Sequence, residues 1–223
     1  MEEAVTKQYL DQIHKNVPAD YYETGIKHNL LQRCWHLHKF RILKKIFADL
    51  PQGGKSLDLG CHSGMLTDHL RKIFNTKMYG IDISGTAIQY AQNKYPANLF
   101  LTADLTEGIP FRDNFFDIVT AFDVLEHISN PQKIGSEIKR VLKNQSILII
   151  GIPNENLLFK MVWYFWVKCR GKVWQDVHVN CFDENLLYAS FSVAGFEKIK
   201  EIKTHLTMWK IIIYKINNNK ELC

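Results

Sequence analysis

The chain has 223 residues, a formal net charge of +5, 46% hydrophobic residues and 23% charged residues. This composition is ordinary for a folded globular protein and excludes disordered, collagen-like and coiled-coil chains. A chain of this length can form one α/β domain, and its scattered basic residues give only weak support for a nucleic-acid partner.

The N-terminal segment and the cysteines favour a cytoplasmic protein with reduced thiols. The first ten residues do not place a basic segment before an apolar run, so they do not resemble a secretory signal. The longest strongly apolar run, 161–167, is far shorter than the ~20 residues that cross a bilayer. The five cysteines are odd in number and form no Cys-x-x-Cys pair, which argues against disulfides and zinc. We therefore expect a cytoplasmic protein without a metal site.

A helical pattern precedes an alternation of strands and helices. Apolar residues recur at helical spacing through residues 20–50, until Pro51 and two glycines interrupt them, which predicts one or two helices. From Ser56, short β-rich runs alternate with amphipathic segments, which is typical of a parallel sheet covered on both faces. The expected strands are 56–59, 78–83, 99–103, 118–122 and 147–151, and the expected helices are 65–74, 86–94 and 132–142.

The last third of the chain predicts the edge of the sheet. After Pro153 an aromatic-rich segment, 157–174, precedes an expected helix at 184–193. Two final β-rich runs, 196–202 and 207–213 or slightly beyond, indicate an antiparallel hairpin. The predicted fold is a doubly wound α/β sheet of seven strands, mostly parallel with an antiparallel C-terminal hairpin, plus N-terminal helices and an aromatic-rich cap.

A glycine-rich turn joins the first strand to the helix after it. In Asp58-Leu-Gly-Cys-His-Ser-Gly64, the two glycines let the backbone approach a ligand closely. Free N–H groups at the start of the helix attract a negative group. The second strand ends at Asp82, whose two oxygens can accept hydrogen bonds from both hydroxyls of a ribose. The order of turn and acid predicts a nucleotide-like ligand.

A third acid continues the series. Asp104 closes the next strand and can accept from an adenine amino group, while the N–H of Leu105 can meet a ring nitrogen. A nicotinamide dinucleotide is disfavoured because its Gly-x-Gly-x-x-Gly fingerprint needs three glycines. When this fingerprint is aligned with the turn, Asp58 takes the first glycine position, and the third glycine position falls on Cys61 or Met65, depending on the alignment. Neither alignment supplies all three glycines.

Together these segments resemble the ordered motifs of class I S-adenosylmethionine-dependent methyltransferases. The resemblance rests on residues 58–64, 79–82, 103–104 and 116–127 and is strong across 55–155. Residues 177–183 and 194–196 are more loosely similar to the small-molecule branch that includes ubiquinone-type, methyltransferase type 11-like enzymes. The resemblance implies a Rossmann-like fold, S-adenosyl-L-methionine as cofactor and S-adenosyl-L-homocysteine as product.

The resemblance also implies a role for each position of the cofactor site. The turn at Gly60 holds the methionine part, Asp82 holds the ribose and Asp104 faces the adenine. The backbone around Phe122 approaches the methionine amino group, which Asp58 helps to orient directly or through water. The expected cofactor residues are Asp58, Gly60, Cys61, His62, Gly64, Asp82, Ile83, Asp104, Leu105 and Phe122.

Segments outside the cofactor core are expected to select the methyl acceptor. Within a single domain, 1–223, we expect a helical cap (1–54), the cofactor-binding core (55–155), a cap or lid insertion (156–182), and a closing helix with edge strands (183–216). Aromatic residues can line an apolar acceptor pocket, form a lid or simply pack. Those of interest are Tyr21, Tyr22, Trp35, Trp163, Tyr164, Trp166, Trp174 and Tyr188. Basic residues flank the apolar run in 157–174, so a peripheral membrane contact is a further interpretation.

Two histidines are candidates for the chemistry. Methyl transfer is an in-line displacement, so holding the acceptor and the methyl group in line supplies much of the catalysis. Where the acceptor must lose a proton, histidine is the usual base. His127 follows the fourth strand and His178 precedes the late helix, so either can serve. His28, His36 and His38 lack ligand partners at metal spacing and are interpreted as a solvated face.

The sequence predicts methylation of a small metabolite, which can be apolar, with O-methylation favoured. DNA is not an expected partner, because Phe122-Asp-Val-Leu125 stands where amino-methylating DNA enzymes of this fold carry an Asn/Asp/Ser-Pro-Pro-aromatic loop. A non-catalytic scaffold that binds S-adenosylmethionine and a methyltransferase acting on protein or transfer RNA stay open as alternatives.

Overall fold

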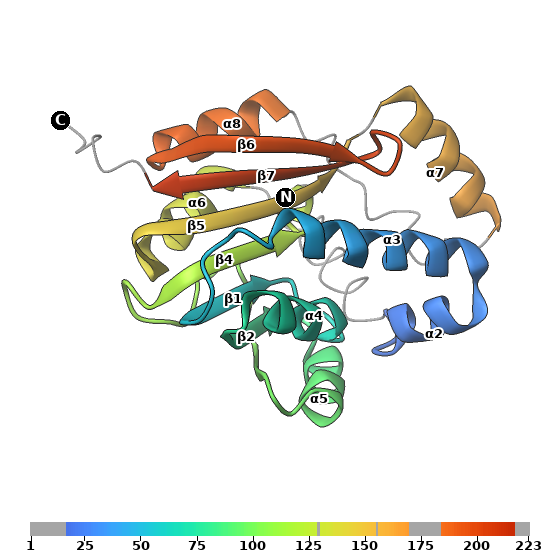
Figure 1. The fold of residues 1–223 in the computed structure, drawn as a ribbon, viewed down its shortest axis with the longest axis horizontal. Coiled ribbons are helices and arrows are strands. Elements are labelled where there is room, and N and C mark those ends of the chain that lie inside the picture. Colours follow the sequence, from blue (N-terminus) through green and yellow to red (C-terminus); the bar gives the residue numbers. More distant parts are fainter. Residues whose placement is uncertain (1–16, 129, 155, 170–183, 217–223) are drawn as a thin grey trace, which may run out of the picture.

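A seven-stranded sheet forms the centre of the molecule (Figure 1). The computed structural model describes residues 17–128, 130–154, 156–169 and 184–216. The strand order is β3-β2-β1-β4-β5-β7-β6, with β1 to β5 parallel and β7 antiparallel to both of its neighbours. This confirms the predicted sheet and its C-terminal hairpin. The strands are β1 (Lys55–Leu59), β2 (Lys77–Asp82), β3 (Leu99–Thr102), β4 (Phe116–Phe122), β5 (Leu142–Pro153), β6 (Phe196–Thr204) and β7 (Trp209–Ile216).

Helices cover both faces of this sheet (Figure 1). One face carries α3 (Leu30–Ile46), α4 (Met65–Phe74) and α5 (Gly85–Lys94), and the other carries α6 (Pro131–Val141) and α8 (Glu184–Val193). Two further helices, α2 (Tyr21–His28) and α7 (Leu157–Cys169), lie at the end of the molecule toward which the parallel strands run. The helices at that end therefore cover the edge where ligands bind in doubly wound folds.

The central strand β1 fixes the position of the site. Its last four residues are buried, as expected for a parallel strand that is covered on both faces. Leu59 pairs with Ile81 of β2 on one side and with Ala121 of β4 on the other. Because the three strands end in register, the residues that follow them meet at one edge of the sheet.

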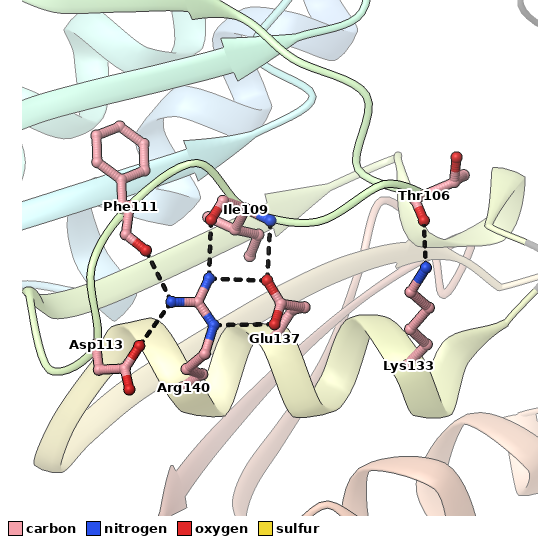
Figure 2. A network of polar contacts seen from close by, with 7 residues as sticks. All are labelled: Thr106, Ile109, Phe111, Asp113, Lys133, Glu137 and Arg140. Atoms are coloured by element: carbon pink, nitrogen blue, oxygen red, sulfur yellow. Dashed lines mark hydrogen bonds and ion pairs between the residues drawn. The ribbon is translucent and has the colours of Figure 1, made fainter.

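The loop after β3 is fixed to α6 by a polar network (Figure 2). Arg140 donates to the carbonyls of Ile109 and Phe111, each at 2.8 Å, and forms ion pairs with Asp113 and Glu137. The guanidinium holds the pKa of Glu137 down at about 2, and the same carboxylate accepts the Ile109 N–H. The network, which also contains Lys133 and Thr106, orders the loop that carries Asp104 and Leu105 into the site.

The strand boundaries differ most from the sequence prediction at β5 and β7. β5 begins at Leu142 rather than at 147, because the pairing with β4 jumps from Phe116–Leu142 to Ile118–Ile147 across polar residues. β7 begins at Trp209 rather than at 207. The preceding residues, 205–207, form a turn in the left-handed region, with φ of 51°, 55° and 68°.

Candidate active site

A cavity of about 1020 Å³ lies at the carboxyl ends of β1, β2 and β4. Its walls come from the segments after these strands, from α2, α3 and α7, and from the β6–β7 turn. Ligand pockets commonly measure about 300–1,000 Å³, so a nucleoside-sized ligand leaves room for a second molecule. Six of the predicted cofactor residues line this cavity: Gly60, His62, Asp82, Ile83, Asp104 and Leu105. The other four, Asp58, Cys61, Gly64 and Phe122, are not among its lining residues.

The turn after β1 requires glycine at Gly60. Its φ is +69°, and a Cβ atom there would lie 2.6 Å from Cγ2 of Val124. The Gly60 N–H donates to the Ile81 carbonyl, which holds the turn against the end of β2. His62 also lies in the left-handed region, with φ of 43°, and its N–H donates to Asp82 at 2.9 Å. The second strand therefore holds the turn in its strained conformation.

Asp82 keeps acceptor capacity toward the cavity. Its Oδ2 accepts the His62 N–H and its Oδ1 accepts the Ser84 N–H, both at 2.9 Å. A carboxylate offers about four acceptor positions, so each oxygen can take one more hydrogen bond. Two oxygens side by side at a cavity wall match the vicinal hydroxyls of a ribose.

Asp104 and Leu105 form the next part of the wall. Asp104 Oδ1 accepts from both the N–H and the hydroxyl of Thr106, at 2.8 and 2.7 Å. The Leu105 side chain is buried in the core below the cavity. No residue of the described chain accepts a hydrogen bond from the Leu105 N–H. A flat base edge that needs one donor and one acceptor fits these two residues.

Asp58 lies behind the turn. Only 2% of it is exposed, and its two oxygens accept from the hydroxyls of Thr67 and Thr120 at 2.6 and 2.7 Å. Burial raises the pKa of this carboxyl to about 6, although both hydroxyl hydrogen bonds oppose the shift. Asp58 thus joins β1 to α4 and β4 beneath the cavity.

The comparisons with known proteins agree with this geometry. A family described as a methyltransferase domain matches residues 57–150. The uncharacterized protein MJ1123 of Methanocaldococcus jannaschii is 32% identical over 152 residues, which are 68% of each chain. The chain belongs to the class I S-adenosylmethionine-dependent methyltransferases. The sequence resemblance is thereby confirmed, and S-adenosylmethionine is the cofactor of this methyltransferase.

Other relatives of the methyltransferase differ in the acceptor that their names give. A mitochondrial ubiquinone biosynthesis O-methyltransferase of Candida albicans is 31% identical over 46% of this chain and 33% of its own length. A ribosomal protein L11 methyltransferase of Dictyoglomus thermophilum is 37% identical over 48% of this chain and 36% of its own. The chain thus spans about a third of each. A methyltransferase structure from Aquifex aeolicus shares the fold, with a TM-score of 0.63 and 22% identity over 81% of this chain and 90% of that one.

The cavity of this methyltransferase fits its cofactor at one end. The donor and acceptor set there consists of the glycine turn, the paired oxygens of Asp82, and the acid and N–H at Asp104 and Leu105. The remaining predicted residues shape that end from behind. Cys61 and Phe122 are buried, and burial raises the pKa of the Cys61 thiol.

A lysine–aspartate–tryptophan cluster, formed by Lys39, Asp123 and Trp209, was not predicted. The Lys39 ammonium of α3 lies 2.6 Å from Asp123 Oδ2 and 4.3 Å from the ring centroid of Trp209. The Trp209 indole donates to Asp123 Oδ1 at 2.7 Å. Lys39 is only 5% exposed, whereas Asp123 and Trp209 line the cavity. The cluster fixes α3 to the end of β4 and the start of β7. The sequence places Asp123 directly after the fourth predicted strand, where site residues are expected. No sequence feature distinguishes Lys39 from its neighbours in the helix.

One of the two candidate histidines lines the cavity, and so does a histidine that was interpreted as part of a solvated face. His127 lies in a 3₁₀ turn (Leu125–His127) and lines the cavity, whereas His178 lies outside the described residues. The interpretation of His36 as part of a solvated face is wrong, because His36 also lines the cavity with its ring against Tyr22. Burial lowers the pKa of His36 to about 4, so its ring is neutral at pH 7. The rotation of α3 about its own axis turns this side chain toward the cavity. This rotation depends on packing against the sheet and cannot be read from the local sequence.

Aromatic and apolar side chains form the other end of the cavity. Trp35 lines this end, and so does Phe159 of the aromatic segment. Tyr21 and Tyr22 also line the cavity, and the Tyr22 ring lies against His62 of the glycine turn. The suggestion that Tyr188 lines the pocket is wrong, because its hydroxyl donates to Glu201 of β6 at 2.8 Å and its ring packs on the α6–α8 side. The side chains of Trp163 and Trp166, and all of Trp174, lie outside the described part of the chain.

Proposed function

We propose that this methyltransferase transfers a methyl group to oxygen of a small acceptor that binds beside the cofactor in the same cavity. The observation that carries the proposal is the two-ended character of this one cavity. Its polar end contains Gly60, Asp82 and Asp104. Its other end is lined by aromatic and apolar side chains from the helices and the β6–β7 turn, among them Trp35, Leu37, Phe159 and Met208.

The proposed cofactor roles follow the geometry of the polar end. Asp82 accepts from the ribose hydroxyls, Asp104 and the Leu105 N–H take the base edge, and the turn at Gly60 takes the methionine part. Ile83 and His62 complete the wall, while Asp58, Cys61, Gly64 and Phe122 set the backbone from behind. When it is bound, S-adenosylmethionine supplies a methyl group on a positively charged sulfur, and an acceptor oxygen held in line can displace it.

An acceptor hydroxyl needs a neutral base, and two cavity histidines are in place. We propose that His127 or His36 accepts the hydroxyl proton, because both line the cavity. His36 is uncharged at pH 7, since burial holds its pKa near 4, and the same shift makes it a weaker base than an exposed histidine. His178 stays a prediction, as do the division into four segments and the cytoplasmic location.

Methyl transfer from labelled cofactor tests the proposal. The purified chain is incubated with S-adenosylmethionine that carries a labelled methyl group and with phenols, alcohols, amines, protein extract or transfer RNA. We expect label in hydroxylated aromatic compounds, together with formation of unlabelled S-adenosylhomocysteine that depends on their presence. Label found in protein or transfer RNA alone would support the macromolecular alternative. Cofactor binding without transfer to any of these acceptors would support the scaffold alternative.

A further inference from the structure

Large apolar side chains are exposed around the mouth of the cavity. Nine of the fourteen exposed large hydrophobic residues of the described chain belong to α3, α7 and the β6–β7 turn. The most exposed are Leu206 at 79%, Leu157 at 78%, and Leu30 and Leu31 at 70% each. We call these three segments, 30–46, 157–169 and 205–208, the mouth surface. Apolar groups gathered in this way mark a surface that contacts another apolar phase.

The mouth surface is continuous with the interior of the cavity. Leu31, Leu37, Val162 and Leu206 are at once exposed to solvent and part of the cavity lining. A molecule that enters between these side chains therefore keeps apolar contacts from the outer surface into the cavity.

The charge on this surface has one sign. Segments 30–46, 157–169 and 205–208 contain no aspartate and no glutamate. Among the described side chains, Arg33 and Arg41 line the cavity and Lys160 is exposed on α7, while Lys39 is buried and Lys44 and Lys45 lie at the far end of α3. Within the described residues, neither Arg41 nor Lys160 forms an ion pair. Apolar side chains set among unopposed cations match an anionic lipid surface.

We propose that the mouth surface docks onto a bilayer containing anionic phospholipid, and that the methyl acceptor is an amphiphile drawn from that bilayer. The second statement rests on the proposed function, whereas the first does not. None of the described helices is long and apolar enough to cross a membrane. In the proposed docking, α7 lies in the interface with the exposed Leu157 and Phe165 toward the lipid. A second copy of the chain is disfavoured as occupant, because a symmetric contact would bring two cationic surfaces together.

Sedimentation with vesicles tests the docking. The full chain is mixed with phosphatidylcholine vesicles or with vesicles that also contain phosphatidylglycerol, at low and high salt. We expect binding to the anionic vesicles, weaker binding at high salt and little binding to phosphatidylcholine alone. Leu157→Glu and Leu206→Glu change exposed side chains, and each is expected to weaken vesicle binding about tenfold. Leu186→Glu on α8, where the leucine is 56% exposed, is the matched control and is expected to bind as the wild-type chain does.

Each outcome separates docking from methyl transfer. Equal binding to both kinds of vesicle, or no loss in the two variants, would overturn the docking. A dimer in light scattering that Leu157→Glu dissociates would overturn it in favour of a contact between copies. Transfer to a water-soluble phenol without vesicle binding would leave the proposed function standing and refute only this inference. Vesicle binding with transfer to no lipid-soluble hydroxyl compound would leave the docking standing and refute the membrane origin of the acceptor.

Discussion

The ion pair between Lys39 and Asp123 has members of unequal burial, and this predicts an unequal response to mutation. The Lys39 side chain is 6% exposed and that of Asp123 is 41% exposed. Asp123→Asn leaves an unpaired ammonium in a buried position, while the indole N–H of Trp209 keeps an acceptor. Lys39→Met leaves a carboxylate that reaches solvent through the cavity and still accepts from Trp209 at 2.7 Å.

The magnitudes follow from what each variant leaves behind. Removing one partner of a buried pair costs about 3–5 kcal/mol, whereas exposed pairs contribute about 1 kcal/mol or less. We therefore expect Asp123→Asn to lower the free energy of unfolding by about 3 kcal/mol and Lys39→Met by about 1 kcal/mol. The double variant should be more stable than Asp123→Asn alone, because Lys39→Met removes the unpaired charge.

Urea unfolding at neutral pH, followed by circular dichroism, measures the three free energies. The slope of the free energy of unfolding against urea concentration should be the same for all variants, so that differences in midpoint report differences in stability. A larger loss for Lys39→Met than for Asp123→Asn, or a double variant as unstable as the sum of the two, would refute the reasoning from burial.

Three further changes test the site and its support. His36→Gln is expected to lower turnover about 100-fold or more if this ring takes the acceptor proton, while exposed His28→Gln leaves it unchanged; equal effects would contradict the assignment. The pKa of Asp58 is raised by burial from 3.8 to about 6, so the stability from this group is present below pH 3.8 and is lost as pH rises through 6. Unfolding midpoints should thus show Asp58→Asn gaining roughly 2 kcal/mol on the wild-type chain between about pH 4 and pH 7, whereas a constant difference would refute the shift. Gly151→Ala places a methyl group against two aromatic rings and should cost about 1–3 kcal/mol in thermal unfolding; a cost no larger than that of Gly85→Ala, where only one atom lies within 4 Å, would contradict the packing.

The sheet was predictable because its strands are short apolar runs bounded by turn residues. The boundary of β5 was missed where the chain bulges, since polar Lys143 to Ser146 interrupt the apolar pattern although they continue the strand. The helical spacing of apolar residues in 20–50 predicted helices there but not the surroundings of each side chain. In the structure Leu43 is fully buried in the core, whereas Leu30 and Leu31 are exposed at the cavity mouth. Periodicity shows which residues share a helix face, and the tertiary fold decides what that face meets.

The cofactor end of the site was easier to predict than the acceptor end. Asp82 ends β2 and Asp104 follows the neighbouring parallel strand β3, so topology alone brings them to the same edge of the sheet. Lys39 and His36 come from a helix whose rotation against the sheet depends on packing by distant residues, Trp209 among them. No local signal in α3 distinguishes these two side chains from the exposed lysines and histidines beside them.

Calorimetric titration with S-adenosylmethionine tests the cofactor end most directly. The purified, cofactor-free wild-type chain is predicted to bind one equivalent with micromolar affinity, and Asp82→Ala is predicted to bind about tenfold more weakly or worse, a loss of roughly 1.4 kcal/mol. Circular dichroism shows whether the variant is folded. Absence of binding to the folded wild-type chain, or equal binding by the folded variant, would contradict the assignment of this cavity as the cofactor site.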